Sequence, residues 1–384
     1  MTKKQFRQNH PVLQRPVSPR IPTTALTGLA HGNGLYVAVG GLYSLKYFIY
    51  PDPPQVKDRS GIILSSPDGI TWSRIFATIP ALWNVAYGSG TFVATGQAGT
   101  ILTSTNGPSW TVEDSHTTSS LYGVTFANNQ FVAVGENGTV ITSPDGFTWQ
   151  NHALESSALL YTVAYGNGAF LAAGEQLVSS ANGVDWTKIK QQRPIHFWSV
   201  AFGVGRFVGV STDGGLCCGT YTSDDGVTWV KHDRQFGFYV QSISYQAGRF
   251  VALGVPLAVS VDGLHWRVAE QPAAAILGGI VYADGMWTAV GSSSDILQSA
   301  ESGSALLGRP SWTNNGVQFL VSGLPENSYR VEAATLGTNL DWRAIGTVKL
   351  NNAPVEFIDT QATNYSSRIY RAVRVTSEAQ DSSR

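Results

Sequence analysis

The sequence is poor in charged residues and in cysteine. Charged residues make up 13% of the 384 positions, the formal net charge is −1, and no block of Lys or Arg occurs. Surfaces that bind nucleic acid or anionic membranes normally carry a basic stripe, so we expect neither partner. The cysteines are adjacent, Cys217-Cys218, which excludes a disulfide framework. No His-x-His, Cys-x-x-Cys or His-Glu-x-x-His pattern lies near them, so we expect no metal site and no cofactor and interpret the pair as part of a non-catalytic loop.

Long apolar runs are also absent. No stretch approaches the ~20 apolar residues that a membrane-spanning helix needs, and residues 1–20 lack the hydrophobic segment of a signal peptide. We therefore expect no membrane span and a protein that is soluble or peripherally attached. A leader removed before the numbered chain would place it outside the cytoplasm, so the compartment stays open.

Glycine and aromatic residues are abundant. The chain contains 41 Gly, 11 Trp, 15 Tyr and 16 Phe, and 43% of its residues are hydrophobic. Turn formers mixed with aromatics indicate many short strands. The length exceeds that of a typical single domain, so we expect one large domain and one small one.

Internal repetition dominates the sequence. A phrase of the form aromatic-Gly-x-Gly-x-aromatic-Val-Ala-x-Gly returns seven times, for example as YGSGTFVATG (87–96) and YGNGAFLAAG (165–174). A second phrase, such as SPDGITW or STNGPSW, follows six of the copies and ends in a tryptophan. These tryptophans are Trp72, Trp110, Trp149, Trp186, Trp229 and Trp266. Repeats of this period are typical of propellers and solenoids.

Each repeat predicts a four-stranded meander, with strands A and B joined by the Gly-x-Gly turn, strand C before the second phrase, and strand D beginning at the Trp. One such sheet cannot bury two apolar faces, but a closed ring of them can. We therefore predict an all-β, seven-bladed β-propeller over residues 26–303. Its core includes the strand B aromatics Tyr36, Phe92, Phe131, Phe170, Phe207, Phe250 and Trp287.

The ends of the chain depart from the repeat. The seventh copy lacks its strand D, and Phe6–His10 resembles Trp149–His152, so we predict that the N-terminal segment 1–25 closes blade seven through residues 4–13. Residues 304–376 alternate in short strands and predict a small β-sandwich. The tail, 377–384, is expected to be disordered.

The second phrase resembles the Asp-box (BNR) repeat, although each copy is one residue shorter between Asp and Gly. Asp-box propellers include sialidases, other glycoside hydrolases, and non-catalytic photosystem II stability/assembly factors. The resemblance implies that the box lies at the rim, where its aspartates are structural. Those aspartates are Asp68, Asp145, Asp225 and Asp262. The C-terminal stretch is similar to Ig-like modules that end many bacterial surface and secreted proteins.

Two features could carry function on the face that holds the B–C and D–A connections. The insertion 41–60 is rich in aromatics, and we interpret Tyr43, Tyr47, Phe48 and Tyr50 as partner-binding. A second set of aromatics, one in each of four successive blades, lies four residues before the last aromatic of strand A. This set is Trp83, Tyr122, Tyr161 and Trp198. They could stack on sugar rings at the mouth of the channel, or fill the wedge between blades, which we favour.

An enzyme is the weaker interpretation. Arg20-Ile21-Pro22 resembles the Arg-Ile-Pro segment that opens sialidase propellers, but two further arginines would have to converge with it, and Arg206 and Arg249 lie in turns on the opposite face. No catalytic residue is assigned. We predict a non-catalytic propeller that binds protein partners in a larger assembly; the alternative is a carbohydrate-active protein, either a glycan-binding lectin or a sialidase-like glycosidase.

Overall fold

The structure is a computed structural model of the chain. It describes residues 24–42, 61–75, 79–152, 154, 156–191, 193–211, 219–232, 236, 240–269, 276–292, 296–298, 304–307, 311–313, 315–322, 328–335, 343–350, 355–364 and 368–375. The chain divides into two compact units, a ring of sheets and a C-terminal unit.

The ring contains seven antiparallel sheets, each a meander of consecutive strands. The first strands, strand A, are β1 (Thr24–Gly32), β5 (Leu82–Gly88), β9 (Leu121–Ala127), β13 (Leu160–Gly166), β17 (Phe197–Gly203), β21 (Val240–Gln246) and β25 (Leu277–Ala283). The second strands, strand B, are β2 (Leu35–Leu42), β6 (Thr91–Gly96), β10 (Gln130–Gly135), β14 (Ala169–Gly174), β18 (Arg206–Ser211), β22 (Arg249–Gly254) and β26 (Met286–Gly291).

The outer strands complete the blades. The third strands are β3 (Gly61–Ser66), β7 (Ile101–Ser104), β11 (Val140–Ser143), β15 (Leu177–Ser180), β19 (Gly219–Ser223), β23 (Ala258–Ser260) and β27 (Ile296–Gln298). The fourth strands are β4 (Ser73–Ile75), β8 (Thr111–Glu113), β12 (Gln150–Asn151), β16 (Thr187–Lys188), β20 (Val230–His232) and β24 (Arg267–Val268). Short 3₁₀ turns, η2 (Gln97–Gly99) and η3 (Glu136–Gly138), join the second and third strands of blades two and three.

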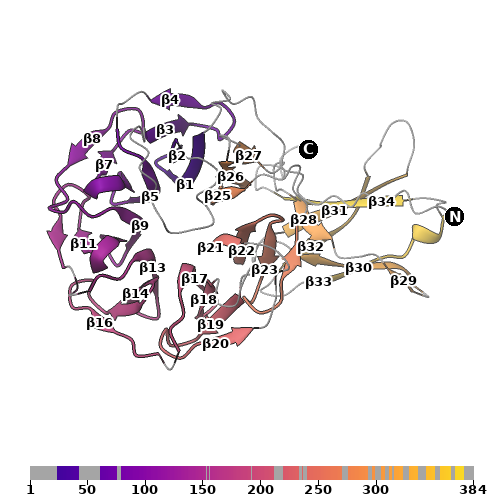
Figure 1. The fold of residues 1–384 in the computed structure, drawn as a ribbon. Coiled ribbons are helices and arrows are strands. Elements are labelled where there is room, and N and C mark those ends of the chain that lie inside the picture. The colour runs from indigo at the N-terminus through magenta and orange to yellow at the C-terminus, as the bar shows by residue number, and fades with distance from the viewer. Residues whose placement is uncertain are drawn as a thin grey trace. The chain divides into compact units, whose positions relative to one another are not determined.

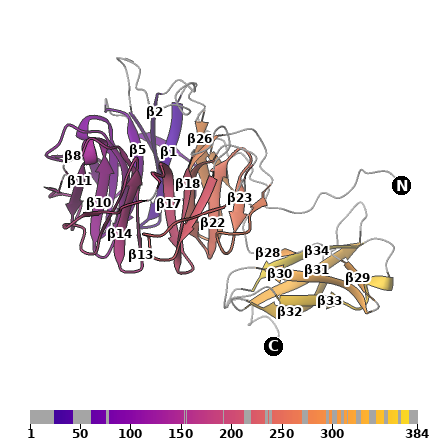
Figure 2. The ribbon, with the colours of Figure 1, turned by 60° about the horizontal axis from the view of Figure 1, so that its bottom comes forward.

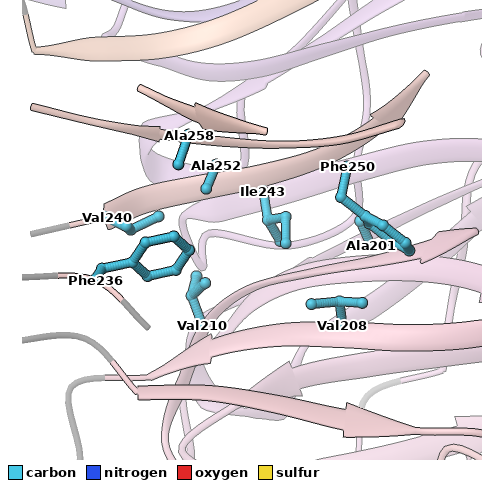
Figure 3. Close-up of a cluster of buried hydrophobic side chains, with 9 residues drawn as sticks. All are labelled: Ala201, Val208, Val210, Phe236, Val240, Ile243, Phe250, Ala252 and Ala258. Atoms are coloured by element: carbon cyan, nitrogen blue, oxygen red, sulfur yellow. The ribbon is translucent and has the colours of Figure 1, made fainter. Parts of the chain in front are cut away.

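The sheets form a closed seven-bladed β-propeller, as predicted. Strand A of each blade contacts strand A of both neighbours, and β25 contacts β1, so the innermost strands surround the axis of the ring (Figure 1). Seven buried hydrophobic clusters lie one at each boundary between neighbouring blades. The cluster between blades five and six is drawn in Figure 3, where Phe236 and Phe250 pack among alanines, valines and Ile243. Each blade therefore shares its core with both neighbours.

The turns between strands A and B follow directly from the repeated glycines. Both central residues of each turn have positive φ, as in a type I′ hairpin. These residue pairs are Asn33-Gly34, Ser89-Gly90, Asn128-Asn129, Asn167-Gly168, Val204-Gly205, Ala247-Gly248 and Asp284-Gly285. The tight turns let strand B fold back over strand A, and they bring the strand B aromatics into the core.

The strand B aromatics are buried in the first six blades, with exposed fractions between 0% and 2%. Trp287 in blade seven is half-buried, which corrects the prediction that all seven are fully core residues. Strand D also differs in detail, because it begins one residue after the Trp rather than at it. The tryptophan indole N–H instead donates to the Gly carbonyl of its own turn, for example from Trp72 Nε1 to Gly69 O at 2.7 Å.

The strands β28–β34 form the second unit (Figure 2). They are β28 (Ser304–Leu307), β29 (Ser311–Thr313), β30 (Gly316–Ser322), β31 (Ser328–Thr335), β32 (Arg343–Lys349), β33 (Val355–Asp359) and β34 (Arg368–Arg374). The first half of β28 pairs with β34 and its second half with β30, so this strand joins two ladders. Tyr329, Val331 and Val321 are the most deeply buried members of the core of this unit.

Three predictions fall outside the described residues. They are the closure of blade seven by residues 4–13 within the segment 1–25, the aromatic loop 43–60, and the tail 377–384. In the described residues, blade seven has three strands, β25 to β27, and its side facing blade one is packed. Tyr36 of blade one donates its hydroxyl to the Ala283 carbonyl at 3.1 Å, which ties the first blade to the last.

Candidate functional site

Strand A is interrupted by a bulge at the same position in six blades. In blade two the register steps from the Leu82–Gly96 pair to the Asn84–Thr95 pair, which leaves Trp83 without an opposite residue. The equivalent bulged residues are Thr27, Tyr122, Tyr161, Trp198 and Gln241. A bulge bends the strand locally and re-aims the extra side chain.

Four of these bulged residues form the aromatic row, which we define as Trp83, Tyr122, Tyr161 and Trp198. The centroids of neighbouring rings lie 5.7, 5.7 and 4.9 Å apart along the row. The first two contacts are tilted or edge-on, whereas Tyr161 and Trp198 stack with an interplanar angle of 28°. The predicted set is thus brought together as one continuous strip across blades two to five.

The row is partly exposed, and this separates it from the core. All four side chains are half-buried, whereas the wedges between blades are filled by the fully buried strand B aromatics. Trp198 also packs against the cluster between blades five and six, so part of the predicted wedge-filling role applies to it. The ends of the row are polar: the Thr27 hydroxyl donates to the Leu82 carbonyl at 3.2 Å, and Gln241 follows on blade six.

Two carboxylates lie behind the two tyrosines. Glu136, the first residue of η3, accepts the Tyr122 hydroxyl at 2.7 Å and the Ser120 backbone N–H at 3.0 Å. Glu175 follows β14 in blade four and accepts the Leu159 N–H at 2.9 Å. These bonds anchor the start of strand A to the end of strand B, on the face where the connections enter strand A.

The neighbourhood of Tyr161 disfavours its ionised form. Burial is the larger cause, and the negative charge of Glu175 adds to it, so the pKa of Tyr161 rises to about 12. The phenol therefore stays neutral at physiological pH and presents a hydroxyl and an aromatic ring, not a nucleophilic phenolate. The row therefore presents aromatic surface and neutral hydroxyl groups to a ligand.

The four aspartates of the second phrase lie in the turns between strands C and D. Asp68 Oδ1 accepts the backbone N–H groups of Ile70 and Thr71 at 2.8 and 2.7 Å, and the hydroxyl of Ser66 at 2.9 Å. Equivalent bonds form at Asp145, Asp225 and Asp262.

These hydrogen bonds also shift the acidity of the turn aspartates. The pKa of Asp225 falls to about 2, chiefly because the Thr228 N–H donates to it, with a further bond from Val227. Backbone N–H donors lower the pKa of Asp68 and Asp145 as well. The ionised turn is therefore the form that the fold favours.

The other candidates do not extend the site. Tyr43, Tyr47, Phe48 and Tyr50 lie outside the described residues, as do Cys217-Cys218 and Arg20-Ile21-Pro22. Arg206 and Arg249 each begin a strand B, and Arg206 pairs with Asp224 at 3.3 Å in the turns away from the row.

No group of three or more His, Cys, Asp or Glu side chains in the described ranges of the chain could hold a metal ion. Within the same ranges, no helix is long and apolar enough to cross a membrane.

A hollow of about 210 Å³ lies between blades three and four, at the outer strands β15 and β16 of blade four. It is lined by Leu154, Ser156, Gln176, Val178, Trp186 and Lys188. None of the four residues of the aromatic row lines it, so it does not extend the site.

Glu136 and Glu175 were not paired with the aromatics from the sequence alone. A signal was present, because both follow the glycine that ends strand B, in the phrases VAVGE and LAAGE. In an antiparallel hairpin the end of strand B lies beside the start of strand A. Counting back from the turn therefore places each glutamate next to the bulged tyrosine of its own blade.

Comparisons with known proteins agree on the fold alone. No family model and no curated protein matches the chain. Solved structures of YCF48 are similar, namely YCF48 from Cyanidioschyzon merolae (14% identity, TM-score 0.56, covering 75% of this chain and 98% of that one) and YCF48 bound to D1 peptide (14%, 0.57, 77% and 96%). A catalytically inactive virginiamycin B lyase from Staphylococcus aureus with quinupristin is similar to the same degree (12%, 0.58, 74% and 98%).

Proposed function

We propose that this chain is a non-catalytic β-propeller that binds a segment of a partner protein across the aromatic row, as a subunit of a larger assembly. The observation that carries the proposal is the row itself: four aromatic side chains, each on a strand bulge and half-buried, in ring contact across four blades. Aromatic side chains kept partly exposed are typical of protein interfaces.

The geometry of the row favours a chain-like ligand over a sugar. Its three centroid steps of 5.7, 5.7 and 4.9 Å match an extended segment of about five residues at ~3.3 Å per residue. The stacked Tyr161–Trp198 pair turns ring faces toward each other, which reduces the face area that a sugar ring could cover. Glu136 is held by two hydrogen bonds and serves the architecture of the row, so a hydrolytic role is not proposed for it.

The likeness in fold supports the proposal. YCF48 has been solved bound to D1 peptide, so a ring of this kind holds a peptide in that protein. The same fold also occurs in a lyase, so the choice rests on the row and not on the ring.

Three finer assignments belong to this proposal. The turns that contain Asp68, Asp145, Asp225 and Asp262 are structural Asp-box-type turns, which is supported by their repeated Ser–Asp–backbone bonding. The C-terminal unit is an Ig-like sandwich module, supported by its two ladders around one core. The loop aromatics Tyr43, Tyr47, Phe48 and Tyr50 add to the partner surface.

Site-specific photocrosslinking in the source cells tests the proposal. A photoreactive phenylalanine analogue placed at Tyr161 should crosslink one defined protein segment. The matched control places the same analogue at Val112, which is 69% exposed on the outer strand of blade two. The crosslink at Tyr161 should be lost when Trp83 is changed to Ala, in a variant shown by its melting curve to be folded.

Two results would contradict the proposal. Equal crosslinking at Tyr161 and Val112 would show that the row does not select a partner. Binding on a glycan array that disappears with Trp83→Ala or Tyr122→Ala, without a protein crosslink, would establish the carbohydrate-binding alternative instead.

A further inference from the structure

We infer that the bound segment carries one basic side chain, Lys or Arg, seated over Tyr122 between the carboxylates of Glu136 and Glu175. This inference rests on the proposed function and adds the chemistry of the ligand to it. A cation is attracted both to the face of an aromatic ring and to a carboxylate, so the two kinds of group reinforce each other at one place.

Among the described residues that directly follow strand B, the carboxylates lie in blades three and four. The positions that follow strand B carry Glu136 and Glu175 in blades three and four, but Gln97 in blade two and Ser292 in blade seven. Glu175 is exposed and Glu136 is half-buried, and neither has an ion-pair partner in the described part of the chain. The two carboxylates thus give the surface around the adjacent tyrosines a negative charge, with which a ligand cation would pair.

The hydrogen bonds of Glu136 orient its carboxylate toward the Tyr122 ring. Glu136 accepts the Tyr122 hydroxyl through Oε1 while Oε2 accepts the Ser120 N–H, so the carboxylate is held against that ring. Donation from the phenol to a carboxylate also makes the ring richer in electrons, which strengthens its attraction for a cation. The raised pKa of Tyr161 shows that the field of Glu175 reaches the neighbouring ring.

Positive charge near one end of the row disfavours a second basic residue in the ligand. Lys190 and Arg193 lie on the connection that leads from β16 into β17, before Trp198. A polybasic run along the row would bring a second cation toward this connection and be repelled. We therefore expect an isolated Lys or Arg flanked by uncharged residues, rather than a basic cluster.

The test uses a phage-displayed library of random 12-residue peptides, selected on the full chain. Fluorescein-labelled copies of the selected peptides are then measured by fluorescence anisotropy at low and high salt. The site variant is the double substitution Glu136→Gln and Glu175→Gln, which keeps an amide oxygen as acceptor but removes both charges. The matched control is Glu113→Gln, which removes one carboxylate from the outer strand of blade two, where it accepts the Thr103 hydroxyl.

The expected result is enrichment of peptides with a single Lys or Arg, whose dissociation constants rise about tenfold in the double variant and hardly change in Glu113→Gln. Replacing the basic residue of the peptide by Gln should produce a similar loss, and this loss should not add to that of the double variant.

Two other outcomes separate the failure of this inference from the failure of the proposed function. Peptides without a basic preference, whose binding is lost in Tyr122→Ala but unchanged in the double glutamine variant, would overturn the inference and leave the proposed function in place. Peptides that bind equally to the full chain, the double variant and Tyr122→Ala would overturn both.

Discussion

Replacing Gly166 by Ala should destabilise the ring far more than the size of one methyl group suggests. Gly166 ends β13, and a Cβ built there would lie 2.1 Å from the Cγ atom of Phe202 on the next blade. Equivalent contacts, where an aromatic ring covers a glycine of the preceding blade, occur at Gly32, Gly88 and Gly203. In these four blades the glycine leaves room for the aromatic ring of the next blade, whereas Ala127, Gln246 and Ala283 stand at the equivalent position in the other three.

The magnitude follows from the distance. Ordinary carbon–carbon contacts lie at about 3.5–4.0 Å, so the Phe202 ring would have to withdraw by roughly 1.5 Å. It cannot withdraw freely, because Phe207 lies behind it with a centroid distance of 4.8 Å. Overpacking typically costs about 1–3 kcal/mol, and we place Gly166→Ala at the upper end, about 3 kcal/mol.

The matched control is Gly168→Ala, two residues away in the same hairpin. Gly168 has a φ of +79° and no atom within 4 Å of an added Cβ, so the substitution has a conformational cost only. That cost is about 1 kcal/mol. Urea unfolding followed by tryptophan fluorescence measures both losses, and adding Phe202→Leu to Gly166→Ala should restore part of the stability. Equal losses in the two alanine variants, or no recovery in the double variant, would refute the packing argument.

Three further predictions concern single bonds. The pKa of Asp225 is lowered to about 2, so its stabilisation is complete above pH 4 and lost as pH falls toward 2; Asp225→Asn should lower the melting temperature at pH 7 and flatten its dependence on pH between 4 and 2. Gln246→Ala should lower the free energy of unfolding by about 1–3 kcal/mol in urea, since the backbone N–H of Tyr282 loses its 2.7 Å acceptor. Tyr122→Phe should lower stability by about 1 kcal/mol through loss of the Glu136 bond, measured in the same way.

The architecture could be predicted because the sequence motif of one blade occurs seven times along the chain. Gly and Asn residues with positive φ set the turns between strands A and B, strand B supplies one aromatic per blade, and the closed ring is the arrangement that buries both faces of each sheet. The exception, half-buried Trp287, lies in the least regular repeat, so the pattern could not show its exposure.

The candidate site could be predicted only in part. The spacing identified the four residues of the aromatic row as equivalent positions. It gave no reason to expect bulges, because a bulge depends on the register of strand A against strand B. Without the bulges, these side chains were expected to fill the wedge between blades. Glu136 and Glu175 were missed because their link to the tyrosines runs across the hairpin and not along the chain.

Because of the bulges, the residues of the row have no opposite residue in the ladder between strands A and B. The residue before each bulge is always hydrophobic, as Leu82 and Phe197 are, and the residue after it is small or polar, such as Gly123 or Ser199. The bulged residue itself varies from Thr to Trp, because it pairs with nothing in the ladder. Mutation at the bulge can therefore change the side chains of the row one blade at a time without altering the pairing of strands A and B, although Trp198 and Tyr122 also contribute to packing and hydrogen bonding.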